Sequence, residues 1–114
     1  MDIEFEKEWN ALVRKLSDQF NAELDEQGVL FLIGVQELGK GYRQFSKDQK
    51  LEVIHIAICT LLAPYGYYEY EGMDAEGWPH WRSTAKLPHL KPMQQSRLIK
   101  EAILDYFRKS DAVN

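Results

Sequence analysis

Residues 46–64 read SKDQKLEVIHIAICTLLAP, and the other segments are best understood around this stretch. Ser46 is followed three residues later by Gln49, which is the spacing of a capping box at a helix start, and Pro64 ends the apolar run. We therefore predict a helix over residues 47–63. Its apolar residues lie on almost every side: Leu51, Val53, Ile54, Ile56, Ala57, Ile58, Leu61 and Leu62. A helix that is apolar all round is normally buried, so this one should run through the centre of a bundle.

Three other segments are predicted to form helices packed about the central one. In the first segment, apolar residues recur at steps of three and four, as in an amphipathic helix: Phe5, Trp9, Leu12, Val13, Leu16 and Phe20. We expect Gly28 to break the chain after this helix. Residues 29–41, VLFLIGVQELGKG, fit a buried strand or a buried helix; we favour a helix stopped by Gly39, with Gly34 marking close packing against a neighbour. The last helix begins near Pro92 and carries one apolar face: Ile99, Ala102, Ile103, Tyr106 and Phe107.

Residues 65–84, YGYYEYEGMDAEGWPHWRST, hold four of the six tyrosines and two of the three tryptophans. The four residues DAEG fit a type I turn whose glycine supplies a left-handed conformation, which closes a hairpin with a one-residue bulge. The flanking segments YYEYEG and WPHWRS are rich in residues that suit a pleated surface. The pattern therefore predicts a β-hairpin or an ordered aromatic loop before the last helix.

The expected register of this hairpin decides which side chains share a face. In this register, Tyr70 lies opposite Arg82 and Gly72 lies opposite His80. Trp81 shares the other face of the hairpin with Glu69 and Glu71. Pro79 cannot donate a ladder hydrogen bond, so its strand is an edge strand or the pairing fails there. A two-stranded hairpin is marginally stable alone, so one aromatic face should lie on the helices. Most rings are then core, and the alternative is an exposed aromatic patch used for recognition.

The totals indicate one small soluble domain over residues 1–114, with ordinary globular composition. The formal net charge of −4 disfavours binding to nucleic acid or to an anionic membrane surface. The longest apolar run, residues 51–63, is shorter than the ~20 residues of a membrane-spanning helix, and the acidic N-terminus does not resemble a secretory signal. The single cysteine, Cys59, lies in that apolar run, which suggests a buried thiol in a reducing compartment, so we expect a cytoplasmic protein.

No motif in the chain predicts catalysis, a metal or a cofactor. Residues 34–41, GVQELGKG, have the spacing of a phosphate-binding loop, but Gly41 stands where a magnesium-binding Ser or Thr belongs, so a helix end and turn is favoured. Four residues could together bind zinc but lack the paired spacing of zinc motifs: His55, Cys59, His80 and His89. A cysteine nucleophile needs an exposed thiolate, which the apolar surroundings of Cys59 disfavour.

The sequence thus predicts a mostly α fold, a small four-helix bundle-like domain with the hairpin inserted before the last helix. We expect a non-catalytic protein-interaction or assembly module that uses the acidic aromatic hairpin to bind another protein or a second copy in a homodimer. Its expected binding residues are the anchors Tyr70, Trp78 and Trp81, the orienting groups His80 and Arg82, and the acidic rim Glu69, Glu71 and Asp74. The alternative is a small-ligand or metal-binding protein with a site between hairpin and helices that uses His80, His89 and the carboxylates.

Overall fold

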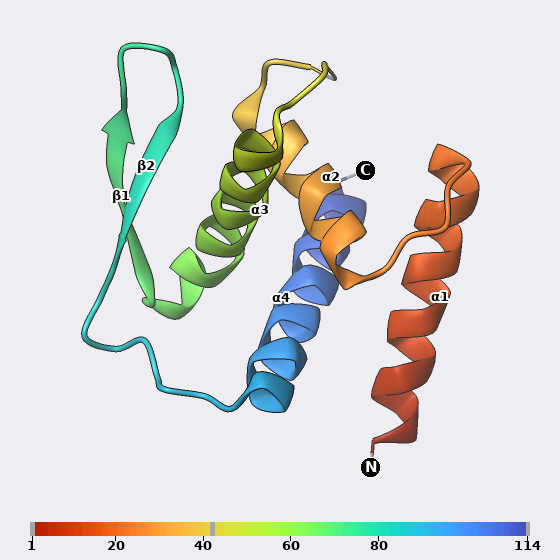
Figure 1. Ribbon diagram of the computed structural model, residues 1–114. Coiled ribbons are helices and arrows are strands. Elements are labelled where there is room, and N and C mark those ends of the chain that lie inside the picture. The colour runs from red at the N-terminus through yellow and green to blue at the C-terminus, as the bar shows by residue number, and fades with distance from the viewer. Residues whose placement is uncertain (1, 42, 114) are drawn as a thin grey trace.

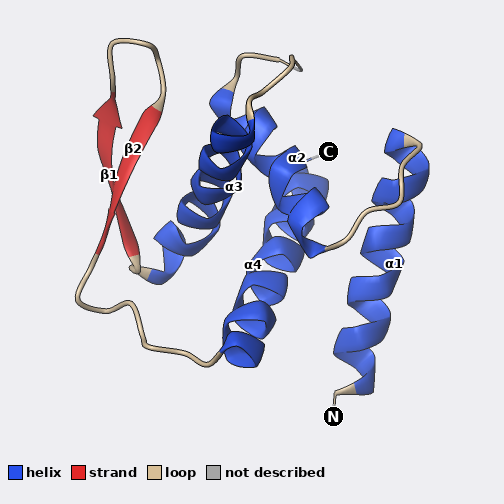
Figure 2. Cartoon of the chain, in the orientation of Figure 1, coloured by secondary structure: helices blue, strands red, loops and turns tan. Residues whose placement is uncertain are grey.

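The computed structural model describes residues 2–41 and 43–113, with side chains up to Lys109. Within these residues the elements follow in this order: helix α1 (Ile3–Phe20), helix α2 (Glu26–Leu38), helix α3 (Lys47–Leu62), the 3-10 turn η1 (Ala63–Tyr65), strand β1 (Tyr68–Met73), strand β2 (Pro79–Ser83) and helix α4 (Pro92–Val113). Helix α3 lies between the hairpin and the helices α2 and α4 (Figure 1). The two strands form a separate antiparallel ribbon beside α3 (Figure 2). The predicted fold class is confirmed.

Helix α3 begins where its sequence predicts. The Ser46 hydroxyl accepts from the Gln49 amide at 3.1 Å, and the Gln49 side chain accepts from the Ser46 amide at 2.9 Å, so the capping box is complete. The helix contributes six buried residues to the interior: Val53, Ile56, Ala57, Cys59, Leu61 and Leu62. It therefore forms the centre of the fold, because elements on both sides pack against it.

Residues 29–38 are helical, as favoured over a strand, and α2 ends at Gly39 in the left-handed conformation with φ of 72°. Gly34 allows α2 to approach α3 at backbone distance. A Cβ atom at this position would lie 2.1 Å from the carbonyl oxygen of Val53 and 2.7 Å from its Cγ1. No side chain fits in that space, so glycine is required for this contact.

The prediction that Gly28 breaks the chain after the first helix is wrong. Helix α1 ends at Phe20, and Asn21 takes the left-handed conformation with φ of 52°. Gly28 instead lies in the first turn of α2, where its amide donates to the Asp25 carboxylate at 2.8 Å. Asparagine tolerates the left-handed region, so the helix can end there without glycine.

Two clusters of buried side chains hold the fold together. The larger joins all four helices: Phe5, Trp9, Leu16, Val29, Leu30, Ile33, Ala57, Leu61, Leu62, Ala102, Ile103 and Leu104. The smaller joins α2, α3, the loop before α3 and the hairpin: Val35, Leu38, Phe45, Val53, Ile56 and Trp78. The smaller cluster therefore fixes the position of the hairpin on the helical body.

The hairpin turn is as predicted, whereas the register is only partly so. Strand partners are Tyr68 with Ser83, Glu69 with Arg82, Tyr70 with Trp81, Gly72 with His80, and Met73 with Pro79. The pairing of Gly72 with His80 is confirmed, and that of Tyr70 with Arg82 is wrong. A bulge between Tyr70 and Gly72 adds one residue to β1, so the pairing shifts by one. Trp81 consequently shares its face with Tyr70 and not with Glu69.

Pro79 causes no break in the ladder. The Asp74 amide donates to the Trp78 carbonyl at 2.9 Å, so these two residues form a hydrogen-bonded pair. In an antiparallel ladder the next pair, Met73 with Pro79, is a non-hydrogen-bonded one. The N–H group that proline lacks would have pointed away from β1, so pairing continues on both sides of it.

Candidate functional site: a groove between the hairpin and the helices

The hairpin is attached to the helices at both of its ends. At the tip, Trp78 is only 8% exposed and meets the Phe45 ring edge to face, with ring centroids 6.4 Å apart. Lys40 adds a hydrogen bond from its ammonium group to the carbonyl of Glu76 at 2.8 Å. At the base, β1 follows α3 through η1, and Tyr67 and Tyr68 pack against the larger cluster. The middle of the hairpin is therefore held over α3 without being packed into the core.

A groove of about 400 Å³ separates this middle part from α2 and α3. We call it the hairpin groove; its lining consists of Tyr70, Met73, Pro79 and Trp81 from the strands and Glu37, Ile56 and Thr60 from the helices. The rings of Tyr70 and Trp81 lie with their centroids 5.2 Å apart. Tyr70 is 53% exposed and Met73 is 61% exposed, so large apolar side chains stand open to solvent at this groove.

The indole N–H of Trp81 is buried and has no hydrogen-bond partner among the described residues. Buried indole N–H groups normally find an acceptor. Leaving such a donor unpaired costs about 1–3 kcal/mol, which is a large fraction of the stability of a small domain. Trp81 thus carries one donor whose capacity the described part of the chain does not use, and this donor is shielded from solvent.

The opposite face of the hairpin is polar and carries two ion pairs. Arg82 lies 2.6 Å from Glu69, and His80 lies 2.9 Å from Asp74. The hydrogen bond from His80, followed by that from the Trp78 amide, lowers the pKa of Asp74 below its ordinary value. These groups are well exposed, so the ion pairs themselves contribute little stability.

Asp74 organises the hairpin turn chiefly through backbone contacts. Its Oδ1 atom accepts from the amides of Glu76 and Trp78, each at 2.9 Å. Since the folded pKa is lowered, this carboxylate stabilises the turn fully above pH 3.8, and the stabilisation is lost as the pH falls through the folded value.

Asp74→Asn should therefore raise hydrogen-exchange rates of the amides in residues 76–80 at pH 5. The ratio of variant to wild-type rates should approach one below pH 3.8; a ratio independent of pH would contradict this role.

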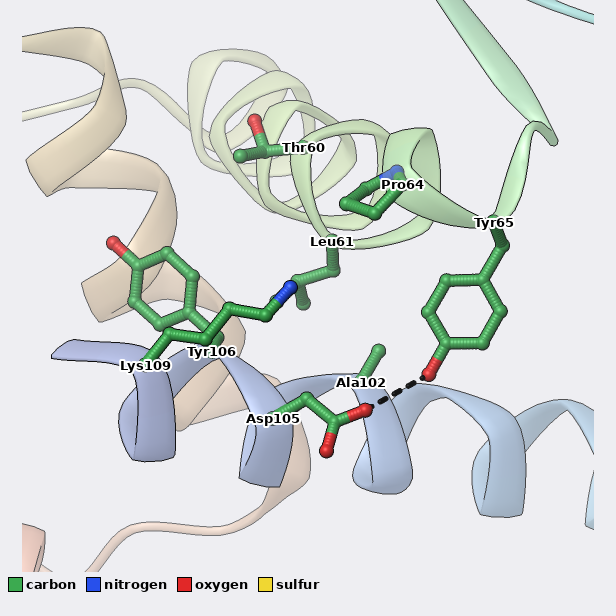
Figure 3. Close-up of a pocket in the computed structure, with 8 residues that line it drawn as sticks. All are labelled: Thr60, Leu61, Pro64, Tyr65, Ala102, Asp105, Tyr106 and Lys109. Carbon is green, nitrogen blue, oxygen red and sulfur yellow. Dashed lines mark hydrogen bonds between the residues drawn. The ribbon is translucent and has the colours of Figure 1, made fainter. Parts of the chain in front are cut away.

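A second cavity, of about 330 Å³, lies between the end of α3 and the second half of α4 (Figure 3). We call it the α3–α4 pocket. Leu61, Pro64 and Ala102 provide apolar walls, and Tyr65 and Tyr106 contribute aromatic rings. Thr60 lines both this pocket and the hairpin groove, so the two cavities adjoin on one surface of the molecule.

The polar groups of the α3–α4 pocket are held by carboxylates. The Tyr65 hydroxyl donates to Asp105 at 3.4 Å, and the Tyr106 hydroxyl donates to Glu37 at 2.9 Å. Burial, followed by the neighbouring carboxylate, raises the pKa of each phenol, so both remain protonated donors. In Figure 3 the Lys109 side chain extends from α4 toward Leu61. Within the described part of the chain, no hydrogen bond or ion pair engages the Lys109 ammonium group.

The potential zinc ligands are not brought together. His55 Nε2 lies 3.4 Å from the Cys59 sulfur, but His80 pairs with Asp74 on the polar face of the hairpin. No three His, Cys, Asp or Glu side chains of the described residues form a group that could hold a metal ion. Burial raises the pKa of the Cys59 thiol to about 12, so it remains protonated. A cavity of about 230 Å³ beneath residues 87–90 includes His55 but neither His80 nor His89.

The predicted binding residues fall into three places. Tyr70 and Trp81 line the hairpin groove, whereas Trp78 belongs to the smaller core cluster and offers no open surface. The predicted orienting and acidic residues lie on the polar face, at the bulge or at the turn: Glu69, Glu71, Asp74, His80 and Arg82. Reasoning from sequence missed Met73 of the hairpin, Thr60 of α3 and Glu37 of α2, because no local pattern shows which residues of the three elements meet at one groove.

Comparisons with models of known protein families, with curated protein sequences and with solved structures found no match. None of the described helices is both long enough and apolar enough to cross a membrane.

Proposed function

We propose that this protein is a non-catalytic interaction module whose hairpin groove binds an extended, positively charged segment of a partner protein. The observation that carries the proposal is the pair of adjoining rings, Tyr70 and Trp81, beside the exposed Met73 at an open groove. Aromatic residues and methionine are enriched at protein interfaces, and a few such side chains supply most of the binding free energy. Methionine also adapts its shape to different partners.

A peptide segment fits the groove better than a purely apolar ligand. An extended chain carries a backbone carbonyl at every residue, and a shift of the Trp81 ring would let its buried, unpaired N–H donate to one of them. Thr60 and Glu37 add polar groups on the opposite wall of the groove. Both ends of the hairpin pack against the helical body, so the groove is preformed and little free energy is lost in ordering it.

The charge of the hairpin favours a basic partner. Residues 68–83 contain four carboxylates and a single guanidinium group, and Glu37 adds another carboxylate at the groove. Such a field attracts a basic segment during diffusion and repels an acidic one. A second copy of this chain carries a net charge of −4, so the same field opposes a homodimer formed through this surface. The buried, free thiol of Cys59 supports a reducing, cytoplasmic location.

Selection from a display library of random 12-residue peptides tests the proposal with a defined probe. We expect enrichment of peptides that combine Lys or Arg with apolar residues. The double variant Tyr70→Ser, Met73→Ser should bind a selected peptide at least ~10-fold more weakly, since two interface anchors together contribute more than ~1.4 kcal/mol. Both residues are exposed, so the variant should keep its fold.

Leu51→Ser is the matched control, because Leu51 is also 61% exposed but does not line the groove. Its affinity for the selected peptide should equal that of the wild type. Enrichment of neutral or acidic peptides, or equal affinity of wild type and double variant, would contradict the proposal.

A further inference from the structure

We infer that the α3–α4 pocket receives a lysine or arginine side chain of the same partner segment, in competition with the chain's own Lys109. This inference depends on the proposed function. It identifies the pocket as the place where a positive charge of the partner segment would bind. The hairpin groove and the pocket share Thr60, so one extended segment can lie across both cavities.

The shape and lining of the pocket suit a long cationic side chain. Leu61, Pro64 and Ala102 offer apolar surface for an aliphatic stem. The rings of Tyr65 and Tyr106 offer faces that attract an ammonium or guanidinium group. A stem with a charged end matches this combination, whereas a compact anion would meet mostly apolar walls.

The charges that surround the pocket also favour a cation. Asp105 of α4 lines the pocket and accepts from the Tyr65 hydroxyl, and Glu37 of α2 accepts from the hydroxyl of Tyr106, whose ring lines the pocket. Arg108 donates to Asp105 at 3.1 Å and is also engaged by Glu8 of α1, so a single guanidinium group is shared between two carboxylates and leaves a net negative charge. The C-terminal end of α3, which carries the negative end of the helix dipole, borders the same cavity.

Lys109 already brings a cation to this pocket, but without a hydrogen bond or ion pair to a described residue. Its side chain lines the cavity and extends toward Leu61 (Figure 3). The side chain is exposed and can swing into solvent at small cost. It is therefore a weakly held occupant that a partner's basic side chain can displace.

The variant Lys109→Met tests the inference by the sign of its effect. It keeps an aliphatic stem but removes the competing charge, so a selected basic peptide should bind about fivefold more tightly, a difference of ~1 kcal/mol. Lys15→Met removes the same charge from an exposed position on α1 and is the control. Its smaller effect measures the change in net charge alone. Replacing the basic residues of the peptide by glutamine should abolish the gain given by Lys109→Met.

The outcomes separate this inference from the proposed function. If Lys109→Met weakens binding, the pocket prefers an anion, and if it matches Lys15→Met, the pocket takes no cation; either result overturns the inference. In both cases the proposed function stands provided that Tyr70→Ser, Met73→Ser still weakens binding. If that double variant has no effect either, the proposed function fails as well.

Discussion

Replacing Gly34 by alanine is expected to lower the free energy of unfolding by about 3 kcal/mol, near the upper end of the usual cost of overpacking. Alanine is the better helix former by ~1 kcal/mol, so propensity alone predicts the opposite sign. The added Cβ atom would lie 2.1 Å from the Val53 carbonyl oxygen, which is backbone and cannot rotate away. Helices α2 and α3 would have to separate, and both core clusters include residues from this pair of helices. Urea denaturation followed by circular dichroism measures the change.

Gly28→Ala is the matched control within the same helix. A Cβ atom at Gly28 would meet only side-chain atoms, the nearest being Leu24 Cδ2 at 3.1 Å, which can shift. The amide of residue 28 would still donate to Asp25. We expect this variant to unfold within about 0.5 kcal/mol of the wild type. Equal losses in Gly28→Ala and Gly34→Ala would contradict the close backbone contact between α2 and α3.

Trp78→Ala is expected to cost about 3–5 kcal/mol, the range for removing a buried aromatic side chain. The loss should be concentrated in the hairpin, because Trp78 is the hairpin's buried residue in the smaller cluster and its ring packs against Phe45. Hydrogen exchange should therefore accelerate in residues 68–83, while the larger cluster between the helices stays protected. Peptide binding should also fall, since the groove depends on a hairpin held at its tip.

Tyr70→Ala serves as the control for Trp78→Ala in the same hairpin. Tyr70 is 53% exposed, so its removal should change the free energy of unfolding by less than ~1 kcal/mol. Tyr70→Ala is thus expected to weaken binding with little loss of stability, whereas Trp78→Ala should reduce both. A large loss of stability in Tyr70→Ala, or a small loss in Trp78→Ala, would contradict the assignment of Trp78 to the core and of Tyr70 to the exposed groove.

Local sequence signals predicted the helices well. Ser46 with Gln49 specified the start of α3 through two hydrogen bonds within four residues, and such short-range chemistry is visible in a sequence. Gly34 was also predicted as a close contact, although its neighbour Val53 was not. The first helix ends at Phe20 with Asn21 as its C-cap, and not at Gly28, because asparagine can also adopt the left-handed conformation.

The candidate site was harder to predict because it depends on long-range packing. The bulge between Tyr70 and Gly72 turns Trp81 toward Tyr70, and the turn and strand residues alone do not specify it. Trp78 and Trp81 look alike in the sequence, yet the position of Phe45 decides which of them is buried. The α3–α4 pocket was missed entirely, since its lining comes from α3, η1 and α4, which the hairpin separates along the chain.

The indole signals of the three tryptophans offer the most direct measurement of the central claim. In a ¹H–¹⁵N correlation spectrum of the whole protein, each indole N–H gives its own peak, which a Trp→Phe variant assigns. Trp81 lines the hairpin groove and its N–H is unpaired, whereas Trp9 is buried in the larger cluster. Titration with a selected basic peptide should shift the Trp81 peak strongly and leave the Trp9 peak in place. Binding that leaves the Trp81 peak unmoved would show that the partner segment occupies another surface.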